Sequence, residues 1–543
     1  MRSIFIIICC ISIFSACKEN AEKPDTGISE ESLRRYISTL SSDEFLGRKP
    51  FTEGETKTLS FLEEEIKRIG LTPGNGTSFY QDVPLVEIDG KPSDTLELKG
   101  PKPLLLQLGK DFVAYTPHSK HQAISIEASE LVFCGYGIVA PELGWDDYAG
   151  IDMKGKTALV LVNDPGLGSE DSTFFKGDEM MYYGRWTYKY EEAARQGAAG
   201  VLIVHETTMA GYPYAVVQGA SNGAKLHLEN LGYTPCSVLG WVSLDAAKEI
   251  FSNAGQDLQS VMQAARKPGF KALPLPYTVN MTIETKVKSD VSKNVIAIIP
   301  GKETPDEYII FSAHWDHLGI GAMVDGDSIY NGAVDNASGI AALLAIAEAL
   351  MNSGENKRTV VFLWVTAEEQ GLLGSAYYAA NPIFPPEKTV ANLNIDAMYA
   401  LGPMKDFSLF GYGQSEMEDY ATRWAEKQGR YVRADPEPEK GYFYRSDHFN
   451  FAKIGIPALY GKASAEHMEK GKEFAVSQVT DYITIRYHQP GDEYTESFEV
   501  GTIIQDAELY LNIVKELANN GAWPKWKATS EFKPIRDKSR PEN

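Results

Sequence analysis

The chain has 543 residues, a length that suits two or three domains better than one. Hydrophobic residues make up 43% and charged residues 23%, an ordinary globular composition that allows a sizeable core. The 74 acidic residues outnumber the 52 lysines and arginines and give a formal charge of −22. A surface this acidic would repel nucleic acid and anionic membranes, so no nucleic-acid partner is predicted.

The N-terminus has the features of an export signal. One basic residue precedes an apolar run over 4–14, which is too short to span a bilayer stably as a helix. The small residues before Cys17 resemble a bacterial lipoprotein signal, whose cysteine is lipidated; an ordinary signal peptide with a chance cysteine is the alternative. We therefore expect 1–16 to be removed and Cys17 to anchor the chain in the cell envelope, on the periplasmic side or at the cell surface. Residues 17–28 are expected to form a polar tether.

Two amphipathic helices are expected after the tether. Apolar residues recur at helical spacing over 28–42 and again over 54–71, where Gly70 is placed to end the second helix. We assign residues 29–124 to the N-terminal part of the main domain.

From residue 125 the pattern changes to short apolar runs. The predicted strands and the helix among them lie at 131–138, 156–164, 188–197 (the helix) and 198–206. The stretch 125–271 is therefore predicted to be a separate, smaller, β-rich α/β domain.

Two features of this smaller domain carry no assigned chemistry. Cys134 and Cys236 either pair or are buried thiols, and their spacing leaves both options open. Residues 219–223, "GASNG", match the G-x-S-x-G pattern of serine hydrolases, but no convincing helix start follows them. We interpret that match as chance.

The third part of the chain is strongly α/β. Its predicted elements are strands at 294–301, 307–313, 358–366 and 389–397, with a long apolar helix at 338–353. Strands that alternate with helices predict a mixed, mostly parallel sheet flanked by helices on both faces. This catalytic domain is assigned to 272–525, and 526–543 is expected to be a loose polar tail.

Metal-ligand residue types follow the strands of this sheet. After the strands, or at the start of the long helix, come His314, Asp316, Asp335, Glu368, Glu369 and Asp396. Each one alone has a simpler explanation, such as a helix cap, a turn or a core histidine. Together they should converge, because open α/β sheets place ligand sites beyond the carboxyl ends of their strands. Such a cluster would repel itself unless divalent cations lie within it.

Two cations also explain why two glutamates are adjacent. The side chains of Glu368 and Glu369 should point in different directions on a turning backbone. One of them can then bind a cation while its neighbour faces a water on the open side. A carboxylate beside an activated water is what general-base hydrolysis requires.

The motifs of this region resemble those of a known family. In order they are "AHWDH", "GAVDNASG", "TAEEQGLLGS", "NIDAM", "YRSDHFNFAKIGIPAL" and "YHQPGD". They resemble the successive signatures of the bacterial leucyl aminopeptidase family of two-zinc exopeptidases. The resemblance covers the helical N-terminal part and roughly 275–520, and it implies the zinc aminopeptidase fold. The stretch 125–271 resembles the protease-associated domain that some members carry as an insertion.

The resemblance implies a role for each position. The implied ligands of two Zn²⁺ ions, for which Mn²⁺ or Co²⁺ are possible substitutes, are His314, Asp335 (bridging), Glu369, Asp396 and His488. Glu368 corresponds to the general base, and Asp316 to the acid that orients His314. Tyr444 is our candidate for stabilising the oxyanion, with a packed aromatic as an equal alternative. We interpret Asp447 and His448 as structural residues or as residues that surround the ligands. His317 and His467 are left out of the predicted metal site.

These roles predict an aminopeptidase that hydrolyses N-terminal residues from peptides with a free N-terminus. One alternative is another enzyme on the same scaffold: a carboxypeptidase, with Arg445 or Arg486 for the substrate carboxylate, or a glutaminyl cyclase with one metal. The other alternative is a non-catalytic, receptor-like binding protein. Receptor-like relatives lose ligands or the base, whereas this chain keeps all six positions. No oligomeric state is predicted.

Overall fold

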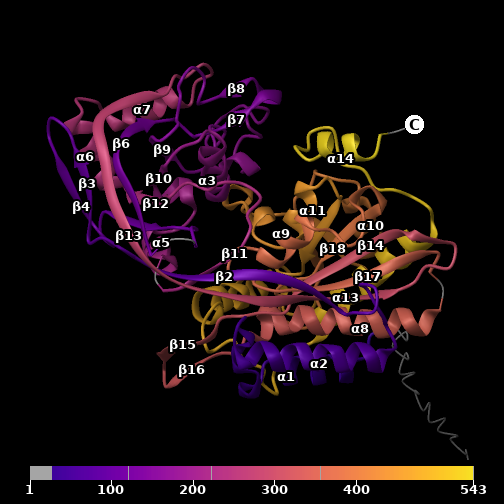
Figure 1. Cartoon of the computed structure of the whole chain (residues 1–543). Coiled ribbons are helices and arrows are strands. Elements are labelled where there is room, and N and C mark those ends of the chain that lie inside the picture. Colours follow the sequence, from indigo (N-terminus) through magenta and orange to yellow (C-terminus); the bar gives the residue numbers. More distant parts are fainter. Residues whose placement is uncertain (1–26, 120–121, 222, 355, 542–543) are drawn as a thin grey trace, which may run out of the picture.

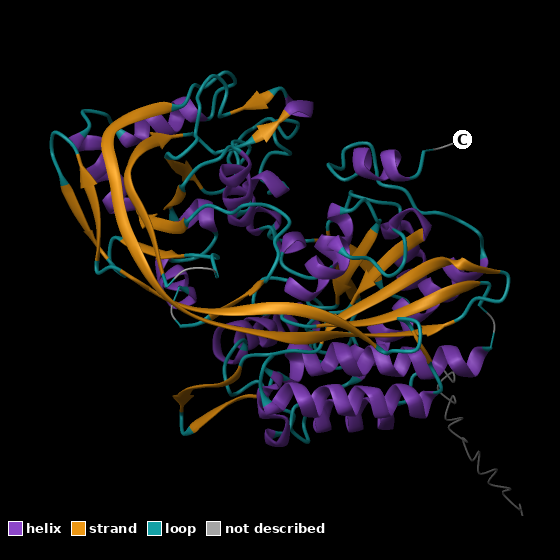
Figure 2. Ribbon diagram, in the orientation of Figure 1, coloured by secondary structure: helices purple, strands orange, loops and turns teal. Residues whose placement is uncertain are grey.

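Two lobes make up the protein, and one long strand runs through both of them (Figures 1 and 2). The computed structural model describes residues 27–541 except 120–121, 222 and 355. The predicted signal peptide, Cys17 and most of the tether lie outside the described residues. Strand β13 (Leu273–Ile299) has 27 residues and contributes to the sheets of both lobes.

The lower lobe is built on a mixed sheet with a parallel centre. In spatial order its strands are β2 (Tyr80–Pro92), β13, β17 (Arg358–Val365), β14 (Thr304–His314), β18 (Thr389–Asn394), β21 (Ala458–Lys462), β19 (Asp406–Phe410) and β20 (Tyr431–Ala434). Strand β1 (Thr72–Pro73) pairs with the end of β13. Strands β17, β14, β18 and β21 run parallel, so their carboxyl ends lie at one edge. The predicted α/β class is confirmed.

Helices cover both faces of this sheet. One face carries α1 (Glu30–Leu40), α2 (Glu53–Ile69), α8 (Ser338–Ser353), α10 (Met417–Lys427) and α13 (Gly501–Asn519), and the other α9 (Leu373–Ala380) and α11 (His448–Lys453). Along β17, Phe362 and Trp364 pack into the core under α8, while Val361 and Leu363 pack on the opposite side. Because both faces are covered, the strand is buried at every position and apolar from Val360 to Val365.

The N-terminal helices formed where the sequence predicted them. Helix α2 ends at Gly70, whose φ of 90° is a left-handed conformation that costs glycine little. Helix α8 and the turn before it, Ala333–Ser353, would suffice by length and composition to cross a membrane, but 89% of its most apolar window is buried. It is the central core helix of the lower lobe.

The upper lobe has its own sheet and cores. Its paired strands are β4 (Leu104–Gln107), β3 (Thr95–Lys99), β13, β6 (Ala123–Phe133), β9 (Thr157–Leu161), β10 (Gly200–His205), β12 (Val238–Ser243) and β5 (Phe112–Tyr115). The helices packed on it include α3 (Trp186–Arg195), α6 (Leu244–Asn253) and α7 (Leu258–Ala265). Leu96 and Phe112 belong to this core, so the upper lobe includes residues that precede residue 125 in the sequence. Cys134 and Cys236 are buried and unpaired thiols.

The remaining elements are short. They are β7 (Val139–Ala140), β8 (Trp145–Asp146), α4 (Thr207–Ala210), α5 (Tyr214–Ala220), β11 (Lys225–Leu228), the hairpin β15 (Gly319–Val324) and β16 (Asp327–Tyr330), α12 (Gly471–Asp481) and α14 (Lys533–Ser539). Ser221 lies at the end of α5, and its hydroxyl donates to the carbonyl of Gln218. The G-x-S-x-G match therefore lies at a helix end, not at a strand-to-helix turn.

The expectation of a loose C-terminal tail was wrong. Trp526 and Phe532 are 3% and 2% exposed and pack against Phe443 and Phe449 of the lower lobe. The tail is polar in overall composition, so its two buried aromatic residues were not predicted to pack. Burying a large apolar side chain contributes about 1.5–3 kcal/mol to stability. Between them Glu531, 6% exposed, forms a 3.0 Å ion pair with Lys176 of the upper lobe.

Candidate metal centre

The carboxyl edge of the parallel strands collects the predicted acidic and imidazole groups. His314 is the last residue of β14, and Asp396 follows β18 by two residues. Glu368 lies in the turn between β17 and α9. Asp335 lies in the turn Ala333–Ala337, directly before α8, and its own φ of −110° and ψ of 95° are not helical. Three parallel strands and the start of one helix thus deliver side chains from distant parts of the chain to one place.

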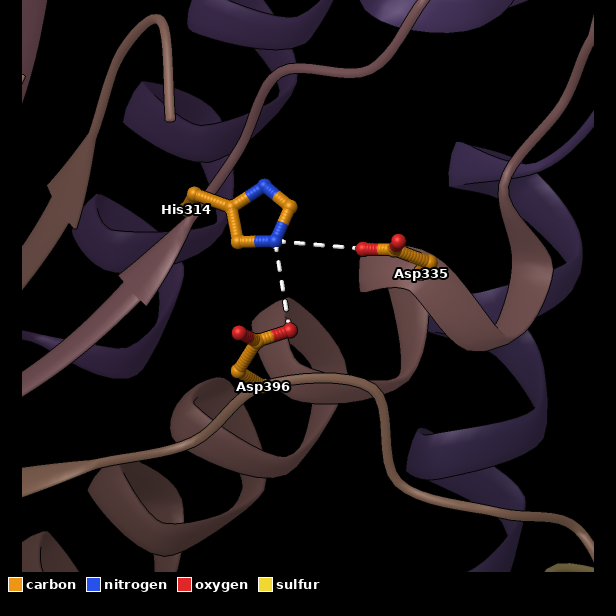
Figure 3. A group of neighbouring side chains, drawn as sticks. All are labelled: His314, Asp335 and Asp396. Atoms are coloured by element: carbon orange, nitrogen blue, oxygen red, sulfur yellow. Dashed lines mark hydrogen bonds and ion pairs between the residues drawn. The ribbon is translucent and has the colours of Figure 1, made fainter. Parts of the chain in front are cut away.

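One group of ligand atoms is centred on His314 (Figure 3). Its Nε2 lies 3.2 Å from Oδ1 of Asp335 and 3.4 Å from Oδ1 of Asp396. All three residues are buried, and one ligand atom of each lies within 4.8 Å of the others. A histidine and two carboxylates at this spacing are a donor set that zinc accepts.

A second group shares Asp335. Nδ1 of His317 lies 2.6 Å from Oε1 of Glu369, and these two residues form a second set with Asp335 within 4.8 Å. Nε2 of His488 lies 3.0 Å from Oε2 of Glu369 and 3.3 Å from Oδ2 of Asp335. The two oxygens of Asp335 therefore face two different groups, which is the arrangement expected of a bridging carboxylate.

The polar atoms of these two groups fit cations. Nε2 of His317 is buried without a hydrogen-bond partner among the described residues, while Oδ1 of Asp335 and Nε2 of His488 contact other members of the two groups. A buried polar atom without a partner costs about 1–3 kcal/mol. Divalent ions would satisfy these atoms and neutralise the carboxylates, so the residues present fit a two-metal site.

Asp316 organises the site differently from the prediction. Nδ1–H of His314 donates to the backbone carbonyl of Asp316 at 3.1 Å, while the nearer carboxylate oxygen of Asp316 lies 3.8 Å from Nδ1. The carboxylate instead accepts from the backbone N–H of Glu368 at 3.0 Å and from that of Glu369 at 3.4 Å. Asp316 thus fixes the turn that presents the two glutamates. Burial raises its pKa to about 7.

The two glutamates have opposite proton affinities. Burial, reinforced by the charges of Asp396 and Glu369, raises the pKa of Glu368 well above its usual range. Burial alone would raise the pKa of Glu369 too, but the imidazoles of His488 and His317 outweigh it and lower that pKa to about 2. Glu369 is thus held against two imidazoles, whereas Glu368 has other carboxylates as neighbours.

Further residues hold the ligands in place. The Ser446 hydroxyl donates to Oδ2 of Asp396 at 2.5 Å and accepts from Asn394 at 2.7 Å. Asp492 accepts from the backbone N–H groups of Val334 and Asp335 at 3.0 and 3.1 Å. Asp492 is the last residue of the "YHQPGD" motif, but the motif alone does not predict this contact.

His317 was excluded from the predicted site, and the structure places it at the second group. The only sequence signal was its position in "AHWDH", three residues after His314. His467 and His448 lie elsewhere: Nδ1 of His467 accepts from the backbone N–H of Glu469 at 3.1 Å, and His448 packs between the rings of Phe443 and Tyr460.

Tyr444 does not point at the ligand groups. Its hydroxyl donates to Oε1 of Glu531 at 2.8 Å, and its side chain is buried beside Phe449 and Tyr182. The packed-aromatic alternative therefore describes its geometry. A different tyrosine lies at the site, since the ring of Tyr487 stacks on that of His488 with centroids 3.8 Å apart.

Replacing Tyr444 with phenylalanine should leave turnover nearly unchanged and lower stability. Loss of an oxyanion donor costs about 10²–10³-fold in kcat, and we expect a change far below that because the hydroxyl serves Glu531. Leaving Glu531 short of a donor should lower the free energy of unfolding by about 1–3 kcal/mol. Steady-state kinetics and urea unfolding measure both effects. A hundredfold fall in kcat at unchanged metal content would restore the oxyanion role.

Comparisons with known proteins relate this chain to peptidases. The sequence profile of Peptidase family M28 matches residues 294–514. The chain is 31% identical over 235 residues to a probable leucine aminopeptidase 2 of Aspergillus fumigatus, covering 40% of this chain and 43% of that protein. It is 22% identical over 463 residues to a glutamate carboxypeptidase 2 homolog of Caenorhabditis elegans, covering 72% of this chain and 54% of that protein. The chain thus spans about half the length of these curated relatives.

Among solved structures, the aminopeptidase from Aneurinibacillus sp. strain AM-1 is similar over 90% of this chain and 94% of its own, with a TM-score of 0.47 and 20% identity. The matched segment 294–514 contains every member of both ligand groups, together with Glu368. Residues 294–514 of this chain are thus similar to peptidase family M28.

Proposed function

We propose that this protein is a two-zinc aminopeptidase that removes N-terminal residues from peptides. The observation that carries the proposal is the pair of ligand groups that share Asp335, with Glu368 beside them. His314 and Asp396 would hold one ion; Glu369 and His488, with His317 next to them, would hold the other. Mn²⁺ or Co²⁺ are possible substitutes for zinc.

The bound ions and the side chains of the protein would have different roles in the reaction. When bound, the ions supply Lewis-acid polarisation of the scissile carbonyl and lower the pKa of water. Glu368 takes the proton from the attacking water and returns it to the leaving amine, and its raised pKa suits both transfers. Asp316 keeps the Glu368 backbone in place through its 3.0 Å hydrogen bond.

The proposed preference for a free N-terminus depends on which cations could bind a substrate carboxylate. Lys462 lies at the site, but its Nζ already donates to the carbonyl of Asp396 at 3.1 Å. Arg445, which a carboxypeptidase might use, donates to the carbonyl of Lys440 at 2.7 Å and packs over Tyr442. Two complete ligand groups also argue against a one-metal cyclase and against a receptor that has lost its ligands.

Matched peptides test the proposed selectivity. An aminoacyl chromogenic substrate should be cleaved, its N-acetylated counterpart should not, and a peptide blocked only at its C-terminus should still lose its first residue. Chelation of the metal should abolish the activity, and added Zn²⁺ should restore it. Cleavage that requires a free C-terminus would replace the proposal with a carboxypeptidase, and turnover that survives complete metal removal would contradict it.

We also propose, from the sequence, that the protein is an exported lipoprotein anchored through Cys17, and that 125–271 is a protease-associated domain. Radiolabelled palmitate should be incorporated into the wild-type chain in a bacterial host and not into the Cys17→Ser variant. Equal labelling of both would refute the anchor.

A further inference from the structure

A fully buried arginine lies outside the matched domain yet contacts the loops that carry the ligands. Arg48 is the last residue of the turn segment η1 (Asp43–Arg48), between α1 and α2, and it is 0% exposed. Its guanidinium donates four hydrogen bonds, all to backbone carbonyls. The acceptors are the carbonyl oxygens of Trp315 (3.1 Å), Leu40 (2.7 Å), Asn331 (2.6 Å) and Gly332 (3.0 Å).

Three of these carbonyls, those of Trp315, Asn331 and Gly332, belong to two separate ligand loops. Trp315 stands between His314 and Asp316 in the loop after β14. Gly332 precedes Asp335 by three residues in the turn before α8. A third link comes from the main chain, because the N–H of His317 donates to the carbonyl of Arg48 at 3.4 Å. One side chain therefore connects the loop of the first ligand with the loop of the shared ligand.

The residue before Arg48 allows this close approach. Gly47 has a φ of 64°, and a Cβ there would lie 2.5 Å from the carbonyl oxygen of Tyr330 and 2.7 Å from that of Gly319. No side chain larger than hydrogen fits at that separation. The η1 segment is thus packed backbone to backbone against both ends of the β15–β16 hairpin that joins the two ligand loops.

The charge of Arg48 also bears on the site. No carboxylate contacts the guanidinium among the described residues, so its charge is balanced at longer range. Burial lowers its pKa to about 10, and the charges that oppose this effect are those of Asp335, Asp492, Asp316 and Glu369. Arg48 stays protonated at neutral pH and reduces the mutual repulsion of these acids.

We propose that Arg48 is a positioning residue of the metal centre, which holds the His314–His317 loop and the Asp335 turn at a fixed separation. The inference rests on the proposed two-metal function. Arginine suits the task because its planar fork presents five N–H donors in fixed directions, whereas lysine offers three on a flexible stem. The N-terminal segment is then part of the site, although it lies about 250 residues before the family match.

Arg48→Lys tests the proposal in the full-length chain. Zinc affinity, measured by competition with a chromophoric chelator, should fall by about 10- to 100-fold, the range for groups that orient metal ligands. At saturating zinc, kcat should fall while KM changes little. The matched control is Arg358→Lys, since Arg358 is also buried, at 2% exposure, and bonds to the carbonyls of Leu517 and Ala522 away from the ligands.

The outcomes separate a positioning role from general stability. Equal zinc affinity in Arg48→Lys and wild type would overturn the inference, as would an equal loss of affinity in Arg358→Lys. If Arg48→Lys does not fold, Asp43→Ala decides: exposed Asp43 accepts from Asn331 at 2.8 Å in the same contact. A severalfold loss of affinity at unchanged melting temperature supports the inference, and unchanged affinity overturns it. A wild-type chain that binds no zinc would refute the proposed function itself.

Discussion

Replacing Glu368 with glutamine should lower kcat by about 10²–10⁴-fold, the contribution typical of a positioned general base. Glutamine keeps the size and the backbone hydrogen bond to Asp316 but cannot take a proton. Glu368 is absent from both ligand groups, so the variant should retain the wild-type metal content. Steady-state kinetics on an aminoacyl substrate, together with elemental analysis of the purified protein, measure the two quantities.

The control for this substitution is Glu55→Gln. Glu55 is 7% exposed, its pKa is raised by burial, and it accepts from Ser292 at 2.6 Å and from the N–H of Phe51 at 2.6 Å. It is thus a buried glutamate with a perturbed pKa outside the ligand groups, and its replacement should leave kcat near the wild-type value. Turnover that persists in Glu368→Gln would show that another group is the base.

Replacing Asp335 with asparagine should remove metal from both sites and abolish turnover. Each of its oxygens faces a different imidazole, Oδ1 that of His314 and Oδ2 that of His488, and asparagine offers one neutral oxygen. Groups that only orient a ligand contribute about 10- to 100-fold to affinity, so loss of a shared ligand should weaken zinc binding by more than about 100-fold. Chelator competition measures the affinity.

Asp147→Asn in the upper lobe is the matched control. Asp147 is 1% exposed and accepts from the backbone N–H groups of Tyr136 and Ile138, at 3.1 and 3.0 Å. Its replacement should alter stability without altering zinc affinity. If Asp335→Asn still bound two ions with wild-type affinity, the shared-ligand arrangement would be wrong.

The sequence predicts a site residue best where that residue directly follows a strand or precedes a helix. His314, Glu368 and Asp396 come after apolar runs that had to be buried strands, and parallel strands bring such positions to one edge. Asp335 could be placed because a long apolar helix begins just after it. The structure brings these groups together, while their action as metal ligands stays a prediction.

The sequence does not predict the features of the site that depend on the direction in which single side chains point. The hydroxyl of Tyr444 donates to Glu531 because the tail packs back on the lower lobe through Trp526 and Phe532. No local sequence pattern predicts this packing of the tail. His317 was indistinguishable from a core histidine until its distance to Glu369 was known. The role of Arg48 arises from a loop more than 260 residues away.

The long strand β13 shows the same limit at the level of the fold. Burial alternates along its first half, over 275–285, but residues 286–291 in its middle are all exposed. This polar middle gives no sign that one strand continues from one lobe into the other. Only its pairing with β2 over Ile283–Val295 reveals the continuity. The proposed domain limits therefore stay predictions.

The most direct test of a shared two-metal centre is anomalous diffraction at the zinc edge, from crystals of the full-length chain grown with Zn²⁺. The account predicts two peaks on either side of Asp335, one beside His314 and Asp396 and the other beside Glu369 and His488. Two such peaks would establish the site. A map without a peak at Asp335, or with zinc bound only elsewhere on the molecule, would contradict the account.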